Sequence, residues 1–217
     1  MREKFKQQLE EMYRQMVIMG SLCQQAIAVA VRTLDEEEDR AEKLEAQVFA
    51  VDGEIDDMER EIEALCTKLL LKQQPVAADL RRITAALKRV TDLERIGDQA
   101  ADIAEMTSYV HLPQGRSSHI ADMARAVINM VTDSVDSFVK RDLQLARQVC
   151  AADDRVDELF IQVRRELVEL IAADASYGEQ GLDLLMVAKY LERIGDHATN
   201  VAEWVEYSIT GVHPSNN

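Results

Sequence analysis

The residues best suited to chemistry in this sequence are acidic pairs that occur in duplicate. A string of five residues, Glu-Arg-Ile-Gly-Asp, begins at Glu94 and recurs 98 positions later at Glu192. Residues four apart lie on the same face of a helix, so each string stacks its Glu beside its Asp, which are Asp98 and Asp196. Two carboxylates on one helix face can share a bound cation, and the repetition indicates two copies of one structural unit.

A second set of acidic pairs lies upstream of each string. Asp52 is followed four residues later by Asp56, and Asp153 is followed in the same way by Asp157. The two helices of an antiparallel pair rise by the same distance per residue. The residue number midway between two facing acidic pairs must therefore lie in the turn that joins the helices. The midpoints fall at Pro75 in the first half and just before Ser176 in the second, and both positions have turn-forming neighbours.

We therefore predict one cluster of four carboxylates in each half. The predicted metal ligands are Asp52, Asp56, Glu94, Asp98, Asp153, Asp157, Glu192 and Asp196. A single acidic pair would be a weak indication, because 40 of the 217 residues are acidic, but duplication and matching register make the prediction specific. Each cluster lies about 100° round the helix from an apolar row, so we expect it at the rim of the bundle, partly open to water.

The predicted ligands are all oxygen atoms, which suit hard cations such as Mg²⁺, Mn²⁺, Ca²⁺ or oxidised iron. We expect divalent or trivalent metal ions on these carboxylate clusters, with Mg, Mn, Fe and Zn as the candidates. His197 adjoins Asp196, and we expect it to be a surface or supporting residue in preference to a ligand. We predict neither catalytic residues nor an organic cofactor.

The elements that must position these pairs are long helices. Glycine and proline are scarce, at 8 and 3 residues, and most other residues are good helix formers, so we predict an all-α fold. Apolar or small residues recur at alternating spacings of three and four from Phe5 to Thr33, as on one face of a long helix. The acidic stretch 35–39 ends that helix, and Pro75 suits the first turn of the third helix.

The second half repeats this plan after a stretch rich in proline, glycine and serine. Its predicted helices are about 119–139, 143–172 and 181–209. Long helices joined by short turns pack antiparallel, so we predict two pseudo-symmetric antiparallel three-helix bundles. The predicted division is 1–110 for the first bundle, 111–118 for the linker and 119–217 for the second bundle.

Composition also argues against some classes of function and predicts where the protein is located. The net charge of −15 repels phosphate backbones and anionic lipids, which argues against direct nucleic-acid binding. Three widely separated cysteines lie in apolar runs, as expected of small core residues in a reducing compartment. No apolar stretch approaches the ~18 residues of a membrane span, and the N-terminus has no apolar signal region, so we expect a cytoplasmic protein without membrane insertion.

The doubled string closely resembles the signature of the PhoU family of phosphate-transport and phosphate-signalling regulators. The residues Pro75, Asp79, Leu80 and Arg81 ahead of the first copy share this resemblance, which extends from Met19 to Tyr207. It implies a six-helix architecture of two bundles that hold metal ions or multinuclear clusters on the eight carboxylates named above.

The resemblance also implies a cytoplasmic negative regulator. Its partners would be the ATPase of the phosphate ABC importer and a membrane sensor histidine kinase, through which it would associate with the membrane. One departure is visible, because Asp102 of the first copy is replaced by Asn200 in the second. We therefore expect the two metal sites to differ in charge and affinity.

Two other functions stay open at this stage. One is a metal-free helical adaptor for another transporter. The other is a carboxylate-bridged di-iron oxidase, which needs Glu-x-x-His on two helices. None of the four histidines has a Glu three residues before it, and these are His111, His119, His197 and His213. We therefore predict a protein that is not an enzyme, and leave open the metal, the choice of transporter and kinase, and a homodimer.

Overall fold

The computed structural model of the chain describes residues 2–107 and 118–212, and in this part of the chain it contains helices and no strand. The predicted all-α fold is therefore confirmed. The long helices are α1 (Arg2–Arg32), α2 (Glu38–Gln73), α3 (Ala78–Thr107), α4 (Ser118–Lys140), α5 (Leu143–Ala173) and α6 (Gly178–Thr210). Two short 3-10 helices are η1 (Thr33–Asp35) and η2 (Ala175–Tyr177).

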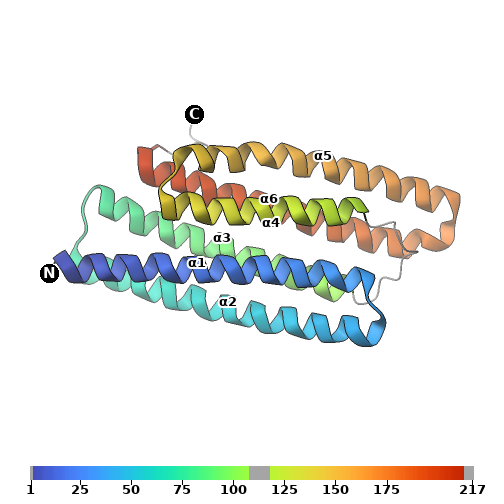
Figure 1. Cartoon of the computed structure of the whole chain (residues 1–217), viewed down its shortest axis with the longest axis horizontal. Coiled ribbons are helices and arrows are strands. Elements are labelled where there is room, and N and C mark those ends of the chain that lie inside the picture. Colours follow the sequence, from blue (N-terminus) through green and yellow to red (C-terminus); the bar gives the residue numbers. More distant parts are fainter. Residues whose placement is uncertain (1, 108–117, 213–217) are drawn as a thin grey trace.

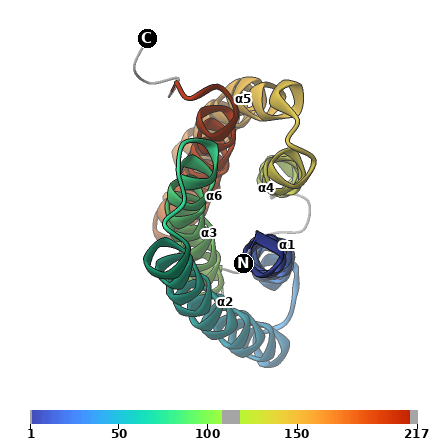
Figure 2. The ribbon, with the colours of Figure 1, turned by 90° about the vertical axis from the view of Figure 1, so that its left-hand side faces the viewer.

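The helices run along one common axis in two layers (Figure 1). The end-on view of Figure 2 shows α2, α3, α6 and α5 side by side in a curved row, with α1 and α4 on its concave side. Helices α1, α2 and α3 form the first three-helix bundle, and α4, α5 and α6 form the second. The most extensive packing between helices joins α3 to α6, so the two motif-bearing helices hold the halves together.

The turns that set the register of each helix pair lie close to their predicted positions. Helix α2 ends at Gln73 and is followed by Gln74, whose φ of 46° is left-handed, and α3 begins at Ala78. Pro75 therefore lies in the loop and not in the first turn of α3, because the left-handed φ of 51° at Ala77 still separates it from the helix. In the second half, η2 precedes α6, which begins at Gly178, three residues earlier than predicted.

One apolar core runs through both bundles. The apolar row on α1, in which residues recur every three or four positions, is buried as predicted, and Met12, Met16 and Met19 are inaccessible to solvent. Gly20 lets α1 approach α4, because a Cβ there would lie 2.6 Å from a methyl of Val135. The shared core keeps the halves in fixed positions, which fixes the carboxylate clusters on their rims as well.

Most of the predicted linker between the halves lies outside the described residues. Of the predicted linker 111–118, only Ser118 lies among the described residues, as the first residue of α4. The division of the chain at this linker stays a prediction. Over the described ranges, no helix combines the length and the apolar character that crossing a lipid bilayer requires.

Candidate metal centres

The first cluster of carboxylates forms where α2 and α3 face each other. Asp52 and Asp56 come from α2, and Asp98 comes from α3. One carboxylate oxygen from each of the three lies within 4.8 Å of the other two, and all three residues are partly buried. The predicted facing of these pairs across the turn is thus confirmed in the first half.

The glycine of the repeated string makes this close approach possible. A Cβ at Gly97 would lie 2.8 Å from Oδ1 of Asp52 and 3.0 Å from a methyl of Ile55. Any larger residue on α3 would push the Asp52 carboxylate away from its neighbours. A glycine inside a helix costs roughly 1 kcal/mol of stability relative to alanine, and here it leaves the space that the Asp52 carboxylate occupies.

Two buried oxygen atoms in the first cluster have no hydrogen-bond partner. They are Oδ1 of Asp52 and Oε2 of Glu94. Arg95 lies nearby, with its Nε 3.5 Å from Oε2 of Glu94 and its Nη1 3.0 Å from Oδ2 of Asp98. The first of these distances is an ion pair without hydrogen-bond geometry, so the buried oxygen of Glu94 stays unsatisfied. Buried polar atoms without partners are rare, and an oxygen-binding cation would satisfy both.

The carboxylates of the first cluster also repel one another. Desolvation, followed by repulsion from Asp56, Asp98 and Asp102, raises the pKa of Asp52 to about 6. Desolvation and Asp98 raise the pKa of Glu94 to about 7, although Arg95 opposes the rise. A group of acids that resists ionisation in this way gains stability when a cation neutralises it. The residues present therefore fit a hard metal ion.

A further acid extends this negative region along α2. Desolvation, followed by repulsion from Glu63, raises the pKa of Glu59, and a hydrogen bond with Thr91 opposes the rise. Asp102 has a raised pKa as well, through desolvation, Asp98 and Glu105. Motif matching missed Glu59, because it lies outside both acidic pairs.

The second cluster has the same helix contact but a looser arrangement. A Cβ at Gly195 on α6 would lie 3.1 Å from Oδ1 of Asp153 on α5. Desolvation, followed by repulsion from Asp196 and Asp157, raises the pKa of Asp153 to about 6. However, no three of its four carboxylates bring their oxygens as close together as the first cluster does within the described residues. Asp157 and Asp196 are exposed, whereas Asp56 and Asp98 are partly buried.

A lysine accounts for part of this difference. The ammonium of Lys189 contacts Oε2 of Glu192 directly and lies 5.7 Å from the ring centre of Phe160. Desolvation and Glu192 raise the pKa of Asp196, and Lys189 opposes that rise. Sequence reasoning missed Lys189, although comparing the two copies beyond the five-residue string would have found it, since Thr91 stands at the matching position.

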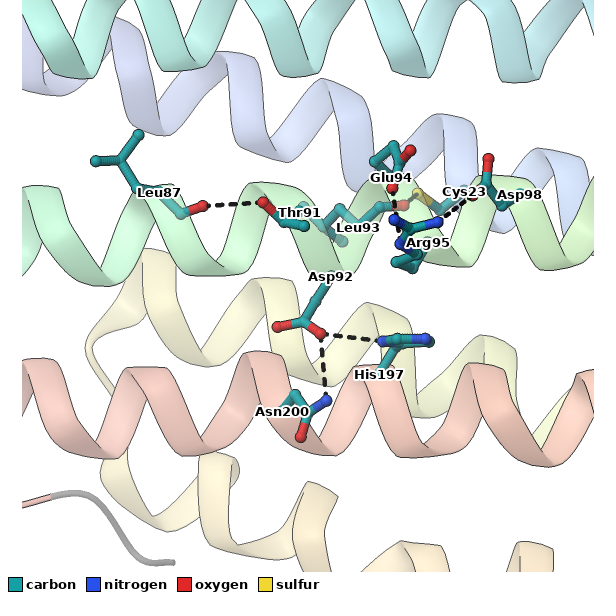
Figure 3. Close-up of polar contacts among 10 residues, drawn as sticks. All are labelled: Cys23, Leu87, Thr91, Asp92, Leu93, Glu94, Arg95, Asp98, His197 and Asn200. Atoms are coloured by element: carbon teal, nitrogen blue, oxygen red, sulfur yellow. Dashed lines mark hydrogen bonds and ion pairs between the residues drawn. The ribbon is translucent and has the colours of Figure 1, made fainter.

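His197 and Asn200 point away from the second cluster and toward the first half. Nδ1 of His197 lies 3.0 Å from Oδ1 of Asp92, and Nδ2 of Asn200 donates to the same oxygen at 3.2 Å. Figure 3 shows Asp92 directed from α3 toward α6, while Glu94 and Asp98 lie on the side of α3 away from α6. The expected supporting role of His197 is therefore a contact between the halves, and Asp92 is a residue that motif matching missed.

Comparison with known proteins gives one consistent result. The PhoU domain model matches residues 16–107 and 120–205. A phosphate-specific transport system accessory protein PhoU homolog from Clostridium acetobutylicum is 39% identical over 216 residues, which are 97% of this chain and 96% of that protein.

Solved structures agree with these sequence matches. The crystal structure of PhoU from Pseudomonas aeruginosa aligns with a TM-score of 0.89 and 33% identity, over 96% of this chain and 100% of that one. The phosphate transport system regulatory protein PhoU from Streptococcus pneumoniae aligns with a TM-score of 0.87 and 24% identity, over 96% of this chain and 98% of that one. The second likeness bears on the fold alone.

Proposed function

The chain belongs to the PhoU family, and from this membership we propose that it is an accessory regulator of phosphate transport that binds metal ions and protein partners. It would act in the cytoplasm, as a negative regulator of phosphate uptake and of phosphate-starvation signalling. Relatives at 37–39% identity carry the name of phosphate-specific transport system accessory proteins, which supports an accessory role in preference to a catalytic one.

The observation that carries the metal-binding part is the first cluster. Three carboxylates from two helices converge, and two buried carboxylate oxygens at the same place have no hydrogen-bond partner. Repulsion of this kind is costly in a folded protein unless a cation relieves it. We propose that Asp52, Asp56 and Asp98 bind the ion directly and that Glu94 completes the site.

A bound ion would supply positive charge that draws α2 and α3 together. In its absence, the acids of the first cluster repel one another across the helix contact. The metal would thus stabilise the folded bundle by mass action. For the second cluster, the four carboxylates Asp153, Asp157, Glu192 and Asp196 remain proposed ligands of a weaker site.

The partners proposed are the ATPase of the phosphate ABC importer and the membrane sensor histidine kinase. The chain would link them from the cytoplasmic side and would reach the membrane only through them. Exposed apolar side chains at the ends of the bundles, such as Leu71, Val76 and Leu182, offer surface for protein contacts. A homodimer is compatible with this role.

Deletion of the gene in its own host tests this function. We expect starvation genes to be expressed when phosphate is plentiful, and phosphate uptake to rise. Expression of the wild-type chain should restore repression. As a second measurement, affinity capture from a phosphate-replete lysate should recover the importer ATPase or the sensor kinase. Unchanged phosphate-responsive transcription and uptake, with neither partner recovered, would favour an adaptor for another transporter.

A further inference from the structure

The two halves of the chain satisfy their carboxylate clusters in different ways. In the first cluster, Oδ1 of Asp52 and Oε2 of Glu94 are buried without a hydrogen-bond partner. Among the described residues of the second cluster, no ligand oxygen is left buried and unsatisfied in this way. The same motif therefore leaves buried carboxylate oxygens without a hydrogen-bond partner in one half only.

Lys189 accounts for part of this difference, since it bonds to Glu192, the counterpart of Glu94. It lies one helical turn before Glu192 on α6, and its ammonium bonds directly to the carboxylate of that residue. Its side chain is partly buried, and the ring of Phe160 on α5 lies beneath the ammonium at 5.7 Å. The ring face attracts the cation and helps to hold it beside the carboxylates.

The matching positions of the first half have the opposite chemistry. The repeat aligns Lys189 with Thr91 and Phe160 with Glu59, so the first half has a hydroxyl and an acid where the second has an ammonium and a ring. The repeat also aligns Asp102 with Asn200, and the amide of Asn200 donates to Asp92 of the other half. Each cluster has one paired cation, which is Arg95 in the first and Lys189 in the second. The first cluster has two further acids at positions where the second has none.

We propose that Lys189 is a built-in cation of the second cluster, which makes the chain an asymmetric metal binder with a strong site in the first half and a weak one in the second. The inference rests on the proposed function, since it assumes that the first cluster binds metal. An ammonium fixed beside Glu192 neutralises part of the charge that would attract an ion and repels an incoming ion. Lys189 is in this sense a residue that determines selectivity between the two sites.

Isothermal titration of the metal-free full chain with Mn²⁺ tests this proposal. Wild-type protein should take up Mn²⁺ in a way that Asp98→Asn abolishes and Asp196→Asn leaves intact. Lys189→Met keeps most of the length of the side chain and removes its charge, so we expect Mn²⁺ binding at the second cluster to become about tenfold tighter. The double variant Lys189→Met, Asp196→Asn should lose this gain. Lys88→Met, at an exposed lysine of α3, is the matched control and should bind as the wild type does.

The reciprocal variant places the lysine in the first half. Thr91→Lys should weaken Mn²⁺ binding at the first cluster about tenfold, and should reduce the rise in Tm that Mn²⁺ produces. Gln7→Lys adds the same charge at an exposed position near the start of α1 and should have little effect. Circular dichroism should show equal helix content in all variants.

The outcomes separate this inference from the proposed function. If the wild type binds Mn²⁺ at the first cluster but Lys189→Met and Thr91→Lys change nothing, the role of Lys189 is wrong and the metal proposal stands. A gain in Lys189→Met that survives Asp196→Asn would also contradict the role of Lys189. If neither the wild type nor Lys189→Met takes up Mn²⁺, both proposals are wrong.

Discussion

The carboxylate of Asp52 on α2 lies in the space that the missing side chain of Gly97 leaves on α3. A Cβ at that glycine would be 2.8 Å from Oδ1 of Asp52, closer than a Cβ atom approaches a non-bonded oxygen. The glycine of the repeated string is thus a condition for the carboxylate cluster. Its position links the helix contact to the chemistry of the site.

Gly97→Ala should weaken metal binding more than it weakens the fold. The Asp52 side chain can rotate away from the new methyl group, and a gain in helix propensity of about 1 kcal/mol offsets the crowding of Ile55. We expect the free energy of unfolding without metal to change by less than about 1.5 kcal/mol. The Mn²⁺ affinity should fall by about tenfold or more, as for other residues that hold metal ligands in place.

Gly53→Ala on the same helix as Asp52 is the matched control. A Cβ at Gly53 has nothing within 4 Å, so alanine there should stabilise the protein by about 0.5–1 kcal/mol and leave Mn²⁺ binding unchanged. Urea denaturation and calorimetric titration measure the two effects. Unaltered Mn²⁺ affinity in Gly97→Ala would refute the link between this glycine and the cluster.

The stability of the metal-free protein should fall as the pH rises from about 4 to about 7 through ionisation of the clusters. The folded-state pKa is raised to about 6 for Asp52 and for Asp153, and to about 7 for Glu94. An acid with a raised folded pKa binds more protons in the folded chain than in the unfolded chain within that window. Its deprotonation therefore costs stability as the pH rises.

Urea denaturation with a chelator, at several pH values across this window, measures the slope. Asp52→Asn combined with Glu94→Gln should make the slope less negative than in the wild type, because these two groups no longer titrate. Saturating Mn²⁺ should have the same effect, since the ion stabilises the ionised carboxylates. Equal slopes in the wild type and the double variant would show that these pKa values are not raised in the folded chain.

Asp92→Ala should destabilise the contact between the two halves. Its carboxylate oxygen accepts hydrogen bonds from Asn200 and from Nδ1 of His197, and only 16% of its side-chain surface is exposed. Loss of a partly buried acceptor with two donors should lower the free energy of unfolding by about 1–3 kcal/mol.

Arg14→Ala is a suitable comparison, because it removes an ion pair with Glu11 that is exposed on the surface of α1. Its effect should stay below about 1 kcal/mol. Thermal or urea unfolding distinguishes the two, and an Asp92→Ala variant as stable as the Arg14→Ala variant would show that the hydrogen bonds of Asp92 do not stabilise the contact between α3 and α6.

The sequence was sufficient to predict the architecture and the places where the acidic pairs meet. Hydrophobic periodicity predicts the helices, and equal rise per residue predicts which residues face each other, so the pair Asp52 and Asp56 could be placed opposite the pair Glu94 and Asp98. Periodicity also predicted the buried row of Met12, Met16 and Met19. These properties depend on the spacing of residues along the chain, which can be read directly from the sequence.

The difference between the two clusters could not be predicted in this way. It depends on the direction of long side chains, such as Lys189 toward Glu192, and on contacts between halves, such as Asn200 with Asp92. The replacement of Asp102 by Asn200 predicted unequal sites, but not the bond that turns Asn200 away from its own cluster. Rotamers are chosen by packing in three dimensions, and motif spacing contains no information on them.

The most direct measurement is anomalous X-ray diffraction at the manganese absorption edge, from crystals grown with Mn²⁺. We predict a peak among the carboxylates of Asp52, Asp56 and Asp98, within metal–oxygen bonding distance of all three, and a weaker peak or none beside Lys189. No peak at the first cluster, or a peak at the second cluster alone, would contradict the proposal that this chain is a metal-binding regulator with its strong site in the first half.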